Sequence, residues 1–372
     1  MKINRPVLFF LFILLASCTG HEKNGATYTN PLFTEGCYPQ ATFYRGKYYY
    51  TMQQPQGDKI ALWETTDITK VAEAKPKTVW TPKDSLAKYH LWSPEIHRIG
   101  NKWYIYFEAD DGNTDNHQIY VIENDSPDPM KGKFHLRGAI MTNPEWNWGI
   151  HPTTFINKGK QYLLWSGWPK RRIEAETQCI YIASMKNPWT LDSKRVMISY
   201  PKYEWERQWI NPDGMRAAYP IYVNENPECS FSRDKKKVLI FYSASGCWTY
   251  YNCEGMLSAN ANSDLLNPTS WTKSREPVFM QSERNGLFGP ASVSFVPSPD
   301  NSEWFILYQV KTVTKNTNAT MIREEGVVNS IRIQKMNWNS QGIPVLGKPA
   351  PTDSVMPKPS GTEQGQNTFG KK

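Results

Sequence analysis

The chain has 372 residues and a formal net charge of +8, and 13% of its residues are aromatic, including 15 Trp and 20 Tyr. This length is enough to bury a sizeable core. The positively charged residues are spread along the chain, and the run of three lysines at residues 235–237 falls in a predicted turn. Neither feature forms the basic face that nucleic-acid binding needs. No phosphate loop, nucleotide fingerprint or Ser-His-Asp signature is present, so no cofactor is expected.

Residues 1–18 have the pattern of an export signal. Lys2 and Arg5 precede an apolar run, residues 7–15, that is too short to span a membrane. The run ends in Leu-Ala-Ser-Cys, which is similar to a bacterial lipobox and predicts cleavage before Cys18 and lipidation of that cysteine. We therefore expect a protein of the bacterial cell envelope that is anchored only by its lipid, with residues 19–29 as a tether. The alternative is a plain signal peptide with a chance cysteine.

A hairpin pattern of X-Pro, β-prone run, polar turn and second β-prone run occurs five times. The copies begin near Tyr38, Ser93, His151, Asn226 and Gly289, at a spacing of roughly 55 to 75 residues. Each spacing is long enough for a four-stranded sheet with its loops, and helical periodicity is almost absent. The repeat therefore predicts an all-β fold, a five-bladed β-propeller over residues 30–349.

Two further segments have their own predictions. Five cysteines follow Cys18, and Cys247 and Cys253 flank a short aromatic loop, which makes them the expected disulfide in an exported protein. No cysteine spacing resembles a zinc site. Residues 350–372 are rich in Pro, Ser, Thr, Gly, Gln and Lys and are predicted to be a disordered tail.

The innermost strand of each propeller blade starts near the central axis, so the five starts should converge on one pocket. They carry Tyr38, Trp92 with Ser93, His151, Glu225 with Asn226, and Gly289. Glycosidic bond cleavage normally needs two carboxyl groups, and these positions supply one, Glu225. Glu228 lies three residues further on, so a period-two strand would turn it to the other face. The alternative for Glu225 is a structural role, in which it binds loop amides.

From about Asn30 to about Gly347 the chain resembles glycoside hydrolase family 43. The resemblance rests on NPL before the first hairpin, HLWSPEIHRIGNKWYIYFEA, WNWGIHPTTF with YLLWSGW, YVNENP, FYSASGCW, NGLFGP and IRIQKMNW. It implies a five-bladed propeller with Glu225 as general acid. It also implies substrate-binding residues in the matching motifs: Trp92, Glu95, Trp148, Trp165, Ser243 and Arg332.

The chain departs from the family pattern at three central positions. Tyr38 stands where the family has its general base, an Asp, and His151 stands where a second Asp tunes the acid. Ser292 replaces a histidine that often lies beside a central metal, so we expect a metal to be weakly bound or absent. The replacement base could be a nearby carboxylate (Glu95, Asp110 or Asp111), Tyr38 could be a nucleophile, or His151 could be an acid or base. Alternatively, Tyr38 and His151 only stack or donate one hydrogen bond.

Two functional hypotheses follow. The first is a glycoside hydrolase, a monomer acting on plant-type oligosaccharides or polysaccharides, with arabinofuranosides or xylosides as the targets that the resemblance implies. The second is a sugar-binding propeller that has kept its pocket and lost its chemistry. Glu225, Trp92, Trp148 and Trp165 suit both. Close agreement of the surrounding motifs favours the hydrolase, while the missing Asp pair favours the binder.

Overall fold

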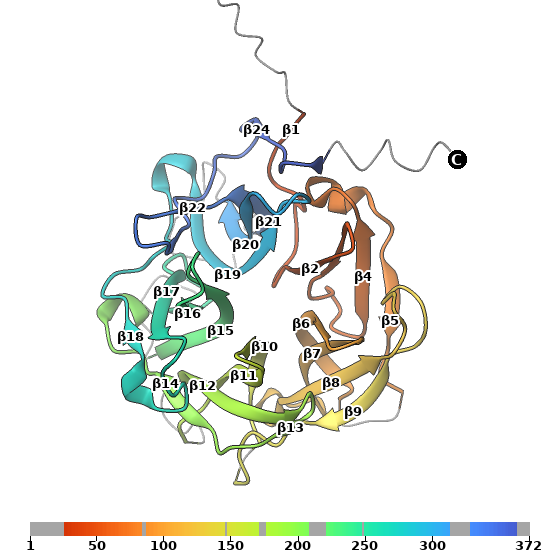
Figure 1. Cartoon of the computed structure of the whole chain (residues 1–372), viewed down its shortest axis with the longest axis vertical. Helices are drawn as coiled ribbons and strands as arrows, with labels where there is room; N and C mark the ends of the chain where they lie inside the picture. Colours follow the sequence, from red (N-terminus) through yellow and green to blue (C-terminus); the bar gives the residue numbers. More distant parts are fainter. Residues whose placement is uncertain are drawn as a thin grey trace, which may run out of the picture.

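The computed structural model describes residues 26–83, 87–145, 147–170, 176–207, 221–247, 249–312 and 328–362. Five blades of antiparallel β-strands surround a central axis, and the chain visits them in order (Figure 1). A short parallel pairing of residues 176–178 with residues 221–223 joins the third and fourth blades. The all-β, five-bladed β-propeller predicted from the repeat is confirmed. The export signal, the tether up to Gly25 and Cys18 lie outside the described residues.

The first four blades have four strands each, numbered from the axis outward. Blade 1 consists of β2 (Gln40–Tyr44), β3 (Lys47–Thr51), β4 (Ile60–Thr65) and β5 (Lys77–Trp80). Blade 2 consists of β6 (Tyr89–Ile99), β7 (Lys102–Asp110), β8 (Gln118–Asn124) and β9 (His135–Ala139). Blade 3 consists of β10 (Ile150–Asn157), β11 (Lys160–Gly167), β12 (Glu176–Asn187) and β14 (Val196–Ser199), with β13 (Thr190–Leu191) also paired to β12. Blade 4 consists of β15 (Ile221–Phe231), β16 (Lys237–Ala244), β17 (Cys253–Asn260) and β18 (Thr272–Lys273).

Blade 5 closes the ring with help from the N-terminal segment. Its strands are β19 (Leu287–Pro297), β20 (Trp304–Thr312) and β21 (Val328–Lys335). Leu32 N donates to Ile331 O at 2.8 Å and Ile331 N donates to Phe33 O at 2.9 Å, so the segment before blade 1 pairs with the last blade. This pairing covers a strand edge that would otherwise be open.

The remaining elements are short. β22 (Asn337–Trp338) pairs with β23 (Pro344–Val345), and the 3₁₀ helices are η1 (Ile68–Glu73), η2 (Thr114–Asn116), η3 (Glu204–Glu206), η4 (Pro268–Ser270) and η5 (Glu283–Asn285). Within the described ranges, no helix is long and apolar enough to cross a membrane.

The disorder predicted for residues 350–372 is wrong for residues 350–362. β24 (Met356–Pro357) pairs with β1 (Thr27–Tyr28), and the two lie together at the edge of the ring (Figure 1). Asp353 N donates to Asn30 O, and Lys358 Nζ donates to Asp67 Oδ2 at 2.7 Å. This polar segment needs no core of its own, because the propeller satisfies its hydrogen bonds. Residues 363–372 lie outside the described part of the chain.

The apolar core lies between the blades. Five clusters of buried side chains each join two neighbouring sheets, and blades 5 and 1 are joined in the same way as the others. Large aromatic side chains fill these contacts, including Trp103, Tyr106, Trp165 and Phe241. Most of the aromatic load of the sequence therefore stabilises the ring.

The five innermost strands share one distortion near the axis. A non-glycine residue with positive φ occurs near the axis in or just before each strand: Tyr38 (55°), Ser93 (42°), His151 (52°), Asn226 (51°) and Ser292 (55°). β6 has a second one, His90 (50°). In β6, β10, β15 and β19 the pairing register breaks across this residue, as in a β-bulge. The equivalent residue of blade 5 is therefore Ser292, three residues after the Gly289 that the X-Pro pattern indicated.

Side chains of the second strands hold several of these distorted residues in place. The acceptor belongs in each case to the preceding blade: Tyr38 N donates to Gln309 Oε1 at 2.8 Å, Asn226 N to Ser166 Oγ at 3.0 Å and Ser292 N to Ser243 Oγ at 3.0 Å. These bonds run from blade to blade and hold the strained backbone at the axis.

Candidate active site

Three of the distorted strand starts bring Tyr38, His151 and Glu225 together at the axis. The rings of Tyr38 and His151 lie 4.9 Å apart between centroids, and His151 Nδ1 lies 4.0 Å from Glu225 Oε2. His151 and Glu225 are each 4% exposed, whereas Tyr38 is partly exposed. The three side chains belong to blades 1, 3 and 4, so the closed ring is what assembles them.

Burial keeps two of these groups neutral. It lowers the pKa of His151 to about 3, with a smaller effect of His117 in the same direction. It raises the pKa of Tyr38 well above its usual value, and the nearby Cys247 and Glu225 add to the rise. At neutral pH the site therefore contains an uncharged imidazole and an uncharged phenol beside Glu225.

Lys311, on β20, is a buried cation in the same neighbourhood. It is 1% exposed and its ammonium makes no hydrogen bond with the part of the chain that the structure describes, while Cys247, Cys37 and Glu225 attract it electrostatically. Burial lowers its pKa, and these three groups oppose the shift. A Cβ on Gly289 would lie 2.8 Å from Lys311 Nζ, so the glycine leaves the room that this side chain occupies. No sequence pattern predicted Lys311.

The predicted disulfide between Cys247 and Cys253 is wrong. Both cysteines are free, as are the other cysteines in the described part of the chain. Cys253 begins β17 and packs in the core between blades 3 and 4, whereas Cys247 lies beside Tyr38 at the axis. The two thiols thus belong to different environments despite their closeness in the sequence.

Two further carboxyl groups border the site and are fully buried. Burial raises the pKa of Glu108 to about 8, and its Oε1 lies 3.8 Å from His151 Nε2. Burial also raises the pKa of Glu254 to about 8, although Ser243 Oγ donates to it at 2.9 Å. Both are therefore largely protonated at neutral pH, and neither supplies an exposed base.

Beneath the distorted residues, the axial cavity is narrow. It has a volume of about 10 Å³ and is lined by residues from four blades, including Gln40, Glu95 and Ser294. Glu95, a substrate contact predicted from the sequence, lines this space, and its Oε2 lies 3.0 Å from His97 Nε2. Thr153 Oγ1 donates to Glu228 Oε2 at 3.5 Å, and burial and the nearby Glu95 raise the pKa of Glu228. The pairing register breaks between Glu225 and Glu228, so this bulge and not a period-two alternation sets the direction of Glu228.

The axial residues do not fit a calcium ion. Calcium takes about six to eight oxygen ligands, while this cavity offers one carboxyl group, that of Glu95, whose pKa burial raises to about 8. The described residues contain no group of three or more His, Cys, Asp or Glu side chains arranged for a metal. No step of the proposed reaction uses one.

The predicted substrate-binding residues divide into two groups. Trp92 is partly exposed and lies 4.3 Å from His117 between ring centroids. Trp148 is 6% exposed, and Trp168 covers one of its faces at 4.1 Å. Trp92 therefore keeps a partly exposed ring, whereas Trp148 is nearly buried against Trp168.

Three other predicted contacts are wrong because the side chains are used elsewhere. Trp165 is completely buried between blades 2 and 3 and stacks on Tyr181. The Ser243 hydroxyl donates to Glu254 and accepts from Ser292 N. Arg332 is also completely buried, and its guanidinium donates to Ala350 O and Thr352 Oγ1.

A histidine–aspartate pair lies beside Trp92. Asp110 was one of the carboxylates predicted as a replacement base, whereas His90 was not predicted. Asp110 is buried, and His90 Nδ1 donates to its carboxylate at 2.8 to 2.9 Å. Asp110 also accepts from Gly112 N, and His117 Nδ1 lies 3.2 Å from it. The side chain of His90 is 43% exposed and its backbone φ is 50°. Because Nδ1 carries the proton, Nε2 of the neutral ring is free to accept one.

The fold, with these residues gathered at its axis, agrees with a glycoside hydrolase of the five-bladed propeller class. The model of the family Glycosyl hydrolases family 43 matches residues 28–344, and the chain belongs to this family. The chain is 35% identical over 347 residues to an extracellular exo-alpha-(1->5)-L-arabinofuranosidase of Streptomyces avermitilis, covering 92% of this chain and 67% of that protein. It is 32% identical over 334 residues to alpha-L-arabinofuranosidase B of Pyricularia oryzae, covering 87% and 64%. The chain thus spans about two thirds of these two relatives.

A solved structure agrees with these relatives. The crystal structure of alpha-L-arabinofuranosidase from Lactobacillus brevis superposes with a TM-score of 0.77 at 30% identity, covering 88% of this chain and 98% of that one.

Proposed function

We propose that the protein hydrolyses α-L-arabinofuranosyl bonds in plant-type oligosaccharides or polysaccharides, with Glu225 as the general acid. The main support is that Glu225 and His151 approach to 4.0 Å in the central pocket of a chain whose relatives are named arabinofuranosidases. A carboxyl group at this position can protonate the leaving oxygen of a glycoside.

His151 is the partner of this acid in the proposal. A base that activates water in an inverting enzyme stands about 6.5 to 9.5 Å from the acid, and His151 is closer than this to Glu225. Burial lowers the pKa of His151 to about 3, so the ring stays neutral and places no positive charge beside Glu225 that would favour its deprotonation. The two side chains lie 4.0 Å apart, beyond hydrogen-bonding distance.

We propose His90, oriented by Asp110, as the group that accepts the proton of the attacking water. Tyr38 is unsuited because its pKa is raised, so the phenol stays protonated. Asp110 is buried and bonded to His90, while Asp111 accepts from Asn113 N and Asn116 Nδ2 on an exposed loop. His90 combines a fixed tautomer, solvent access and a position beside Trp92, with ring centroids 5.9 Å apart.

The His90→Ala variant should lose at least about tenfold in kcat, because a positioned base contributes this much or more. Added imidazole should restore part of the loss, which a purely structural role of His90 would not allow. Turnover of a small arabinofuranoside with and without imidazole measures both effects. His135→Ala, a change of an exposed histidine on β9, is the control. A kcat within about threefold of the parent enzyme would remove His90 from the reaction.

The substrate assignment is tested by a screen with arabinofuranosides, xylosides, galactosides and pectic oligosaccharides, with calorimetric binding in parallel. We expect turnover of arabinofuranosides above all others. Binding without turnover of any bound sugar would instead support a propeller that only binds sugar. Proton NMR of the first-formed anomer then distinguishes a water attack, which inverts, from a Tyr38 nucleophile, which retains.

We propose that the protein is exported and held by a lipid on Cys18. The Leu-Ala-Ser-Cys sequence supports this, as does the word extracellular in the names of the Streptomyces relatives. Metabolic labelling with a fatty-acid probe should mark the parent protein and leave Cys18→Ala unlabelled. Label that persists in the variant would contradict the assignment.

A further inference from the structure

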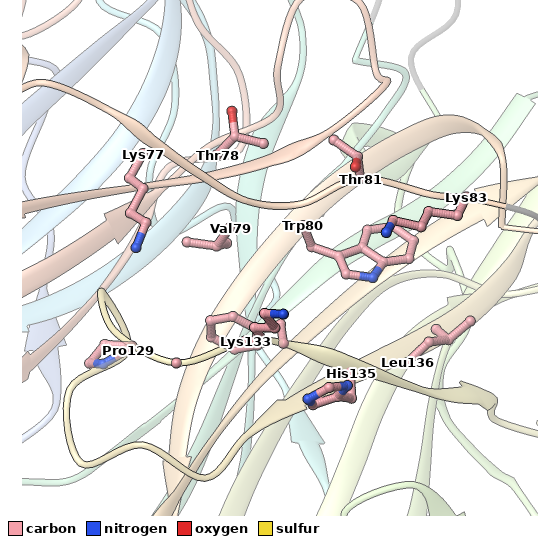
Figure 2. A pocket seen from close by; sticks show the side chains of 12 residues that line it. Lys77, Thr78, Val79, Trp80, Thr81, Lys83, Pro129, Lys133, His135 and Leu136 are labelled. Atoms are coloured by element: carbon pink, nitrogen blue, oxygen red, sulfur yellow. The ribbon is translucent and has the colours of Figure 1, made fainter.

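A second cavity lies at the outer edge of the ring, between blades 1 and 2. It has a volume of about 660 Å³ and is lined on one side by residues of β5 and the following loop and on the other by residues 129–136 (Figure 2). β5 and β9 are the outermost strands of their blades, so this groove is separate from the axial pocket.

The groove is basic. Its lining includes Lys77, Lys83, Lys133 and His135, all of them exposed, and none of its 12 lining residues is acidic. Lys77 Nζ already donates to Met130 O at 2.5 Å. The ammonium groups of Lys83 and Lys133 make no ion pair or hydrogen bond with any residue of the described ranges. Two mobile cations facing one space attract an anionic ligand.

An aromatic surface lies among these cations. Trp80 is only partly buried; its ring is held on one side by Phe107 of β7, at 5.2 Å between centroids. Its indole lines the groove across from Lys133 and His135 (Figure 2). A flat indole supplies an apolar face for the C–H groups of a sugar ring, while the lysines can pair with a carboxylate on that ring.

We propose that this groove binds an oligosaccharide that carries uronic acids, as a second contact with a polysaccharide. Trp80 stacks on a sugar ring, and Lys83 and Lys133 pair with carboxylates on the same chain. When one polymer chain is held in this groove, the effective concentration of its glycosidic bonds at the axial site rises. This binding role is separate from the proposed hydrolysis, because the groove takes no part in bond cleavage.

The test is calorimetric binding of oligogalacturonate to the Glu225→Gln protein, compared with a neutral arabino-oligosaccharide of the same length. We expect tighter binding of the acidic chain and a loss of that preference at high salt. Trp80→Ala should weaken oligogalacturonate binding by at least about tenfold. The double variant Lys83→Gln/Lys133→Gln should weaken it about fivefold, and it keeps the test valid if Trp80→Ala folds poorly.

The matched control is Lys235→Gln/Lys348→Gln, which removes the same charge from exposed positions in blade 4 and beyond blade 5. This control should bind oligogalacturonate like the parent. Equal weakening by both lysine pairs, unchanged binding in the groove variants, or no preference over the neutral chain would each overturn the proposal. Tighter binding of an oligonucleotide of equal charge would overturn the assignment to sugar. The binding is measured with the Glu225→Gln protein, so the result does not depend on whether the parent enzyme hydrolyses arabinofuranosides.

Discussion

The Glu225→Gln variant should lower kcat on natural arabinofuranosides by at least about a hundredfold, because the amide cannot protonate the leaving oxygen. The loss should be much smaller on an aryl arabinofuranoside whose leaving group needs no proton. This contrast separates an acid from a residue that only holds the sugar, since a lost binding contact would depress both substrates alike. The near-isosteric change retains the 4% exposed site beside His151.

Glu228→Gln is the matched control for this experiment. Glu228 lies three residues from Glu225 on β15, but its carboxyl group faces Glu95 and Thr153. The kcat of the Glu228→Gln variant should stay within about threefold of the parent value. Equal losses on both substrates in Glu225→Gln, or a comparable loss in Glu228→Gln, would contradict the acid assignment.

The repeated hairpins allowed the number of blades to be predicted from the sequence. Each X-Pro start is followed by two β-prone runs, and that local pattern is enough to place both inner strands of a blade. The fifth start was misplaced by three residues because Pro290 follows Gly289, whereas the distorted residue, Ser292, precedes a valine. The outer strands are short and half exposed, so they carry a weaker pattern.

From the sequence, only those site residues could be placed whose position depends on the strand register alone. Tyr38, His151 and Glu225 follow from the strand starts. By contrast, Trp92 and Trp165 have similar motif contexts, and only the packing of neighbouring blades makes one partly exposed and the other completely buried. A bulge turned Glu228 toward the axis, and no alternation of apolar and polar residues encodes that break.

Residues that act through partners distant in the sequence, within one blade or across two blades, were missed. His90 lies 20 positions from Asp110, and its role depends on the hairpin that brings β6 and β7 together. Lys311 lies on β20 and Cys247 after β16, yet they interact beside Tyr38. A single sequence contains no pattern that joins such positions.

A buried ion pair behind the proposed acid should have the largest effect on stability. Glu206 is completely buried; its Oε1 accepts from Lys273 Nζ at 2.6 Å, Asn224 Nδ2 at 3.0 Å and Tyr242 OH at 2.9 Å. Its Oε2 accepts from the backbone N of Lys202 and Tyr203. Asn224 directly precedes Glu225, so this carboxylate also anchors the strand that carries the acid.

The Glu206→Ala variant should lose about 3 to 5 kcal/mol of unfolding free energy, because it leaves Lys273 partly buried without its counter-charge. Calorimetry should show a Tm lower by about 10 °C. The exposed pair of Lys47 and Glu64 is the control, and Glu64→Ala should cost less than about 1 kcal/mol. Adding Lys273→Met to a Glu206→Leu variant should recover much of the loss, because no unpaired charge remains. A Tm drop in Glu206→Ala no larger than that of Glu64→Ala would show that β15 is held by other contacts.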